Sequence, residues 1–310
     1  MKKVFLLILI FILFSTFTAS AGYIADINFD NGNITVKGSL SEAKAGRMVF
    51  ISVLKPGEST ENIKLNDNSI PYVIETDSEG AFEYTLNIDA ASISTTDFQY
   101  NLVIGAYDLT NKIIEPFFLC PSIQIMPVVS QIASAATGAQ ISDLFRANSN
   151  ILGFVNQDLD TLPANNKNSV YDGLALKTSF ADVEEFKLAF YSFYVPEKIS
   201  TFSDGAQTEA LISKFDRYVK LSQMQNYSDF FGLEPTAKSS VYAYLAGKPC
   251  HTLSDLEQNL NKGTFLQLMK ATQNISQVQQ VLSKYASKLS LNLTSVTSLN
   301  EPGKVYADMA

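Results

Sequence analysis

The hydrophobic pattern of the chain changes its period once. From Gly22 to about Met126, apolar and polar residues alternate in segments that are separated by Gly, Asp and Asn, which predicts short antiparallel strands. Asp77-Ser-Glu-Gly80 has the composition of a turn joining two of them. Beyond Pro127, apolar residues recur every three or four positions, which predicts helices. The predicted strands are residues 33–40, 47–54, 72–76, 81–88, 99–107 and 116–125.

These two patterns predict an α+β multidomain chain. Residues 22–127 are expected to form an antiparallel β-sandwich with the length of an immunoglobulin-like (Ig-like) module. Residues 128–310 are expected to form an all-α region of helical repeats. We expect the two domains to fold independently, with a boundary between about residues 125 and 135, because the period changes there.

A phrase of six residues, Val-Tyr-x-x-Leu/Met-Ala, occurs three times in the helical region. The copies begin at Val170, Val241 and Val305, which lie 71 and 64 residues apart. Within a helix, the first and fifth residues of the phrase share a face, and so do the second and sixth, so each copy predicts a short buried helix. A long amphipathic helix precedes each copy, and these helices have apolar faces at Ile141–Val155, Leu211–Ser222 and Ile275–Leu289.

The first two copies are each followed by a predicted helix cap. Ser179 precedes Asp182 by three residues, and Thr252 precedes Asp255 by three, which is the spacing of a capping box. One repeat is therefore a long helix, a loop, a Val-Tyr helix and a capped third helix. Because the third copy ends on an apolar phrase at Ala310, we expect the third repeat to be truncated and Val305 to be more exposed than its counterparts.

The first 21 residues have the features of a secretory signal peptide. Lys2 and Lys3 precede an apolar run from Val4 to Phe14, and Ala19-Ser-Ala21 fits a cleavage site. Residues 1–21 are accordingly assigned as a signal peptide, and the mature chain is expected to be secreted or at the cell surface. No later segment is long and apolar enough for a membrane span, so we expect none after signal cleavage.

The net charge limits the kinds of partner that the chain can bind, and the positions of the cysteines predict free thiols. Loss of the two N-terminal lysines would leave 21 basic against 31 acidic residues, and a surface so acidic argues against nucleic acid as a partner. The two cysteines, Cys120 and Cys250, fall in different predicted domains, so we expect two buried thiols rather than a disulfide.

The sequence offers little catalytic chemistry. His251 is the only histidine, which excludes paired-histidine metal motifs, and its neighbour Cys250 is not placed to face it. Two carboxylate pairs, Asp158/Asp160 and Glu184/Glu185, have the residue types of acid–base catalysts, but solvated surface charge is the favoured interpretation. Asp26, Asn28 and Asp30 have the spacing that begins a calcium loop, although a hairpin turn at Asp30-Asn-Gly32 is favoured. We assign no catalytic residues, no cofactor and no metal ligands.

Several stretches resemble modules of large modular surface proteins of Gram-positive bacteria, of the Clostridia and Paenibacillus type. Residues 34–40, 45–57 and 76–82 are similar to their bacterial Ig-like modules, and the Val-Tyr repeats look like helical segments found beside them. The resemblance implies a secreted or cell-surface, non-catalytic modular protein that acts as an adhesion, spacer or scaffold element. Its partner would be a cell-wall or extracellular carbohydrate or protein.

Two other functions remain open from the sequence. The chain could supply accessory modules of a secreted carbohydrate-active enzyme whose catalytic domain lies beyond residue 310. It could also bind a small ligand between its repeats, which a concave pocket with a few convergent polar groups would favour.

Overall fold

A computed structural model of the protein describes residues 24–30, 33–39, 45–59, 72–87, 94, 96–106, 113–220 and 227–291. The chain divides into two compact units, Met1–Pro121 and Ser122–Ala310. The predicted boundary lies slightly later than this division, because helix α2 (Ser122–Ser134) begins directly after the first unit and contains Pro127. The predicted signal peptide and the third Val-Tyr phrase lie outside the described residues. None of the helices in the described ranges has the length and apolarity that a membrane crossing needs.

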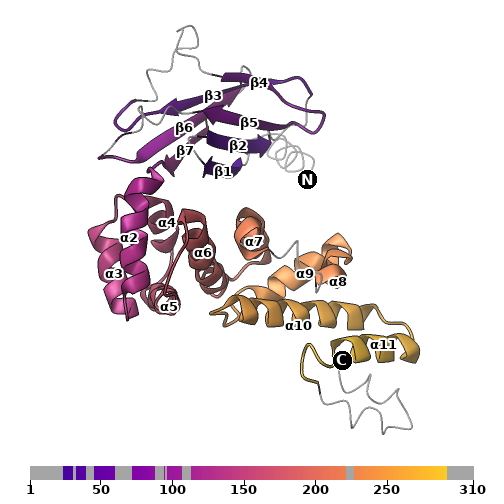
Figure 1. Cartoon of the computed structure of the whole chain (residues 1–310). Coiled ribbons are helices and arrows are strands. Elements are labelled where there is room, and N and C mark those ends of the chain that lie inside the picture. The colour runs from indigo at the N-terminus through magenta and orange to yellow at the C-terminus, as the bar shows by residue number, and fades with distance from the viewer. Residues whose placement is uncertain are drawn as a thin grey trace, which may run out of the picture. The chain divides into compact units, whose positions relative to one another are not determined.

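The first unit consists of two antiparallel sheets (Figure 1). Its strands are β1 (Ile24–Asp30), β2 (Asn33–Ser39), β3 (Met48–Leu54), β4 (Tyr72–Glu75), β5 (Ala81–Asn87), β6 (Gln99–Ala106) and β7 (Ile113–Phe118). The described strands are ordered β1-β2-β5 in one sheet and β4-β3-β6-β7 in the other. Pro116 lies in β7, at the edge of its sheet, where a residue without an amide hydrogen is tolerated.

Alternation along the strands supplies the core of this unit. Val49 and Ile51 of β3 are fully buried, whereas Met48 at the start of the strand is 55% exposed. Side chains from both sheets join one cluster of buried residues: Val36, Val49, Ile51, Phe82, Leu86, Tyr100, Leu102, Ile104, Phe117 and Leu119. Strands β2, β3, β5, β6 and β7 therefore contribute apolar side chains to this core, as a period of two predicts.

The fold class predicted from the sequence, an α+β chain headed by an Ig-like sandwich, is wrong. The chain is mostly helical, and the strands described form two small sheets instead of that module. Alternation specifies a strand with one buried face, but it does not specify how many strands a sheet holds or which strands are neighbours. The last predicted strand also extends too far, since residues 122–125 belong to α2.

The turn at Asp77 has the predicted local structure, but its place in the tertiary structure differs from that of a hairpin turn. Its carboxylate Oδ1 accepts hydrogen bonds from the amides of Glu79 and Ala81, both at 2.9 Å, and Gly80 has a φ of 78°. The turn is therefore present where the sequence predicts one. The strands that it joins, β4 and β5, belong to different sheets, so the turn does not form a hairpin.

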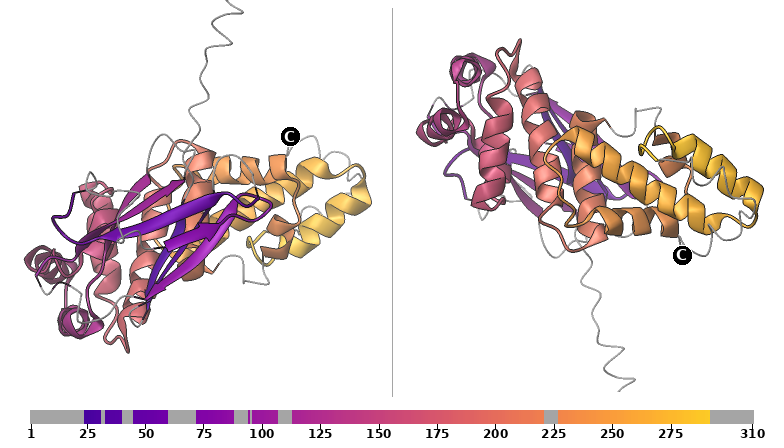
Figure 2. Two further views of the ribbon diagram at one scale, coloured as in Figure 1. Left: turned by 90° about the horizontal axis from the view of Figure 1, so that it is seen from above. Right: turned by 90° about the horizontal axis from the view of Figure 1, so that it is seen from below.

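The second unit, where the structure describes it, is helical throughout. The helices are α2, α3 (Gly138–Ala147), α4 (Gly153–Leu159), α5 (Ala164–Leu174), α6 (Val183–Ile199), α7 (Gly205–Val219), α8 (Ser228–Phe231), α9 (Pro235–Leu245), α10 (Leu253–Ala271) and α11 (Ile275–Tyr285). They follow one another along the unit in chain order, from α2 and α3 at one end to α10 and α11 at the other (Figures 1 and 2).

Two successive helix triplets have the same plan. In the first, α3 packs on α5 and α5 on α6; in the second, α7 packs on α9 and α9 on α10. The middle helices, α5 and α9, contain the Val-Tyr phrase, and Val170 and Val241 are both fully buried. Helix α6 of the first triplet packs on α7 of the second, so the triplets are stacked directly.

Helix α11 corresponds to the first helix of a third triplet. Its N-cap Asn274 lies 70 residues after Asp204, the N-cap of α7. The buried positions agree in this register: Thr208, Ile212 and Phe215 in α7 correspond to Val278, Leu282 and Tyr285 in α11. The repeat thus extends to the end of the described chain, and the expected exposure of Val305 concerns a residue that the structure does not describe.

Glycine at the start of α3 and α7 allows the Val-Tyr helix to approach closely. A Cβ atom on Gly205 would lie 2.6 Å from the backbone nitrogen of Ala243 in α9, and one on Gly138 would lie 2.9 Å from that of Asp172 in α5. Asp172 and Ala243 are both the third residue of the phrase. The equivalent first residue of α11 is Ile275, whose side chain is 45% exposed.

The helix caps correct one prediction and confirm another. Thr252 caps α10, and its hydroxyl and the carboxylate of Asp255 form a complete capping box. Ser179 does not cap α6: Asp182 does, and it accepts a hydrogen bond from the amide of Glu185 at 2.8 Å. The Glu185 carboxylate bonds back to the amide of Ala181 at 2.5 Å, so a capping arrangement is present three residues later than predicted.

We predict that Asp182→Ala and Thr252→Ala each lower the free energy of unfolding by about 0.5–2 kcal/mol, because each leaves amides at a helix start without an acceptor. Urea unfolding monitored by far-ultraviolet circular dichroism measures both. Ser179→Ala is the control and should change stability by less than about 0.5 kcal/mol, since Ser179 is exposed and outside the helix. A larger loss from Ser179→Ala than from Asp182→Ala would contradict the assignment.

We also predict that Gly205→Ala destabilises the protein by about 1–3 kcal/mol, even though alanine favours a helix, because the added methyl group meets the backbone of α9. The matched control is Ile275→Ala at the equivalent position of α11, which should cost less than about 1 kcal/mol because that side chain is half exposed. Equal losses from the two substitutions would show that α7 does not need glycine at this contact.

Candidate functional site

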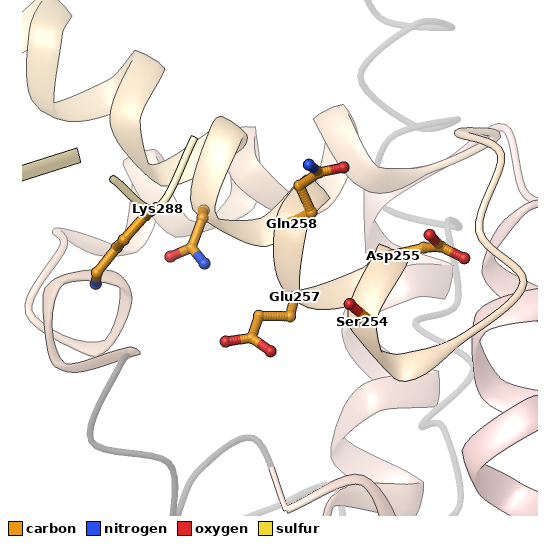
Figure 3. A pocket seen from close by; sticks show the side chains of 6 residues that line it. Ser254, Asp255, Glu257, Gln258 and Lys288 are labelled. Carbon is orange, nitrogen blue, oxygen red and sulfur yellow. The ribbon is translucent and has the colours of Figure 1, made fainter. Parts of the chain in front are cut away.

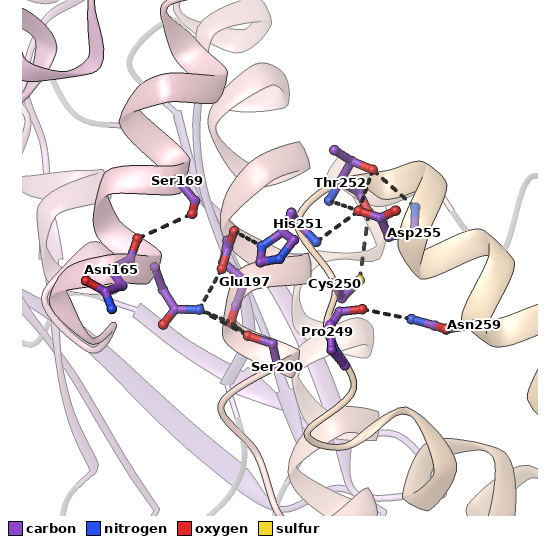
Figure 4. A network of polar contacts seen from close by, with 11 residues as sticks. Asn165, Ser169, Glu197, Ser200, Pro249, Cys250, His251, Thr252, Asp255 and Asn259 are labelled. Atoms are coloured by element: carbon purple, nitrogen blue, oxygen red, sulfur yellow. Dashed lines mark hydrogen bonds and ion pairs between the residues drawn. The ribbon is translucent and has the colours of Figure 1, made fainter.

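A fully buried carboxylate lies where the two helix triplets meet. Glu197, near the end of α6, has no exposed surface. Its Oε1 atom is 2.6 Å from Nδ1 of His251, and its Oε2 atom accepts a hydrogen bond from the amide of Asn166 at 2.6 Å (Figure 4). A buried carboxylate is tolerated only when paired and hydrogen-bonded, and both oxygens of Glu197 have a partner.

Three separate segments bring these groups together. Asn166 is in α5, Glu197 in α6, and His251 in the loop between α9 and α10. The Asn166 amide also donates to the hydroxyl of Ser200 at 3.1 Å. On the other side, the backbone amide of His251 donates to the capping carboxylate of Asp255 at 3.1 Å. The network therefore ties the start of α10 to the first triplet.

A carboxylate on Nδ1 of an exposed imidazole is the arrangement that orients a general base in hydrolases. Such a base activates a nucleophile, and the thiol of the adjacent residue, Cys250, is not suited to that role. Cys250 is buried, its sulfur contacts the carbonyl of Thr252 at 3.8 Å, and burial raises the pKa of its thiol to about 12. The thiol is therefore protonated at neutral pH, a state that does not suit a nucleophile.

The first carboxylate pair flagged in the sequence separates in the structure. Asp158 is buried, accepts a hydrogen bond from the Tyr191 hydroxyl at 3.0 Å and lies 3.6 Å from the Lys214 ammonium. Burial raises the pKa of Asp158, and the charge of Lys214 opposes that effect. Asp160 is on the surface and pairs with Lys167 at 2.8 Å. The two carboxylates thus have different environments and different partners.

The second pair and the calcium-like spacing also lack a shared site. Glu184 pairs with Lys187 at 2.7 Å on the surface, whereas the Glu185 carboxylate accepts a hydrogen bond from the amide of Ala181 at the start of α6. Asp30 lies opposite Asn33 in the pairing of β1 and β2, so the residues of the calcium-like spacing belong to a strand; Gly32 lies outside the described residues.

Cys120 and Cys250 are both free thiols and both buried, as the sequence predicts. Within the described ranges, His, Cys, Asp and Glu form no group that could hold a metal ion.

A polar pocket of about 420 Å³ opens along α10 (Figure 3). Its lining comes from successive turns of α10 and from Lys288, which follows α11; the residues are Ser254, Asp255, Glu257, Gln258, Asn261 and Lys288. A second, more apolar pocket of about 390 Å³ lies between α6, the end of α7 and the start of α10, and includes Phe180, Leu188 and Tyr218.

Sequence reasoning missed both Glu197 and the pocket. Glu197 follows a stretch of nine residues, Leu188 to Pro196, that contains no charged residue, and a single carboxylate after such a stretch in a helix was the available signal. In the sequence, the pocket residues of α10 look like an ordinary solvated helix face, and nothing there indicates that Lys288 lines the same pocket.

No protein-family model matches the chain, and comparisons with curated proteins and with solved structures find no match either.

We predict that His251→Ala lowers the free energy of unfolding by about 1–3 kcal/mol, because Glu197 stays buried with one partner fewer. Adding Glu197→Gln to that variant should recover part of the loss, since the buried charge is then removed. Urea unfolding of the two single variants and the double variant measures the coupling. Additive losses would show that the two side chains do not stabilise each other.

Proposed function

We propose that the protein is a secreted or cell-surface, non-catalytic protein whose helical unit acts as an adhesion or scaffold element. The observation that carries the proposal is that the buried carboxylates are bound to other side chains of the protein. Glu197 is held by His251 and Asn166, and Asp158 by Tyr191 and Lys214, so the buried charges join helices to one another. Groups engaged in this way stabilise an architecture.

Stacked helix triplets suit this role. Each triplet packs mainly on its neighbours, and the stack presents long helix faces to a partner. Export is supported by the sequence at the N-terminus, where two lysines, an apolar run and Ala19-Ser-Ala21 have the order of a signal peptide. The resemblance to modular Gram-positive surface proteins supports a cell-wall partner.

Localisation is tested by expressing the full chain in a Gram-positive host beside a control chain that lacks residues 2–21. The full chain should appear in the medium or on intact cells with Gly22 at its N-terminus, and the control should stay inside. Recovery of the full chain from the cytoplasm, with Met1 retained, would refute export.

The non-catalytic role is tested by incubating the purified protein with purified Gram-positive cell walls. Sedimentation should show that the protein is retained on the walls, while the supernatant gains no reducing ends or free amino groups. Release of either product in proportion to the protein added would make the protein an enzyme. Absence of the protein from the pellet would count against adhesion to the wall.

A further inference from the structure

The pocket between α6, α7 and α10 has walls that are mainly apolar. Leu188 and Ala189 line it from α6, Tyr218 and Val219 from the end of α7, and Leu253 from the start of α10. Leu188, Tyr218 and Leu253 are only partly buried, so some of their apolar surface stays accessible. Its volume of about 390 Å³ falls in the range of small-molecule sites, which are mostly apolar with a few polar groups.

Two lysines add positive charge to this pocket. Lys177 and Lys220 both line it and are both exposed. Within the part of the chain that the structure describes, neither ammonium group has an ion-pair or hydrogen-bond partner. Glu185 also lines the pocket, but its carboxylate is engaged by the amide of Ala181 at 2.5 Å. The described lining therefore carries an excess of positive charge, in a chain whose net charge is −8.

Lys220 has a backbone conformation that usually belongs to glycine. It follows α7 as its C-cap with a φ of 53°, in the left-handed region that disfavours a side chain. Ser290, which occupies the equivalent position after α11, has the same φ. The conformation therefore belongs to the repeat, whereas the ammonium group belongs to this copy, where it lies beside an apolar pocket.

The aromatic rings at the pocket already have partners within the protein. The ring of Tyr191 and the guanidinium of Arg217 both lie 4.4 Å from the centre of the Tyr218 ring. Phe180 packs edge-on against Phe186, with ring centres 5.4 Å apart. A ligand ring or a saccharide would need a free aromatic face to stack on, so these contacts favour an aliphatic ligand.

We propose that this pocket binds a small aliphatic carboxylate, such as a medium-chain fatty acid. The alkyl chain would lie against Leu188 and Leu253, and the carboxylate would meet the ammonium groups of Lys177 and Lys220. Burial of the alkyl chain supplies affinity, and the two lysines select a negatively charged head group. The inference goes beyond the role proposed above and does not rest on it.

The first experiment is isothermal titration of the purified full chain with five probes: butanoate, hexanoate, octanoate, octan-1-ol and 3-phenylpropanoate. Octanoate should bind with one site per chain. From butanoate to octanoate, affinity should rise about threefold to fourfold for each methylene group, as burial of alkyl surface predicts. Octan-1-ol has the same chain without the charge and should bind at least about tenfold more weakly, because it loses both ammonium contacts. 3-Phenylpropanoate should bind more weakly than octanoate.

Variants then test the two lysines. Lys177→Gln and Lys220→Gln should each weaken octanoate binding about threefold, and the double variant about tenfold, while binding of octan-1-ol should not change. The matched control for Lys177 is Lys248→Gln, which follows the second Val-Tyr phrase at the same distance, is exposed and lies outside the pocket. It should leave binding unchanged.

Lys220→Gly separates binding from folding. Glycine has no steric cost in the left-handed region, so this variant should melt at a higher temperature than the unmodified chain and still bind octanoate more weakly. A loss of affinity in a more stable variant cannot come from unfolding.

Absence of binding by octanoate at about 5 mM would overturn the proposal. So would equal binding of octan-1-ol, which would show that the lysines do not read the head group. Tighter binding of 3-phenylpropanoate than of octanoate would make this an aryl site instead. Binding of octanoate at several sites per chain, unchanged in the double lysine variant, would show non-specific adsorption of alkyl chains.

Discussion

The helical unit depends on the close packing of each Val-Tyr helix between its two neighbours. Val170 and Val241 are fully buried because α5 and α9 are each covered on both sides, by α3 and α6 in one triplet and by α7 and α10 in the next. This packing requires a glycine at the start of α3 and of α7, where any side chain would meet the backbone of the Val-Tyr helix. A six-residue phrase and a distant glycine therefore form one packing unit, and the stack is built from such units.

Buried polar groups add specificity to this apolar stack. The contacts of Glu197 with Asn166 and His251 join the loop between α9 and α10 to α5 and α6, and both carboxylate oxygens are satisfied in this arrangement. Asp158 of α4 joins α6 and α7 in a similar way, through Tyr191 and Lys214. Because each buried charge is costly when unpaired, these contacts disfavour slipped arrangements of the same apolar faces.

The sequence by itself determined the local structure of this protein. Period two specified strands β2 to β6 to within one or two residues at each end, period 3.6 specified the helices, and Thr252 with Asp255 specified the start of α10, because each depends on neighbours close in the chain. The choice between nearby N-cap candidates was harder to predict from the sequence. Asp182, three residues beyond Ser179, is an equally good N-cap residue, and Glu185 follows it at the spacing of a capping box. Only the tertiary structure decided that β4 and β5 join different sheets, that Glu197 meets His251 54 residues away, and that Lys288 lines the same pocket as residues of α10. Those outcomes depend on packing between segments far apart in sequence, which the periodicity of a single segment does not encode.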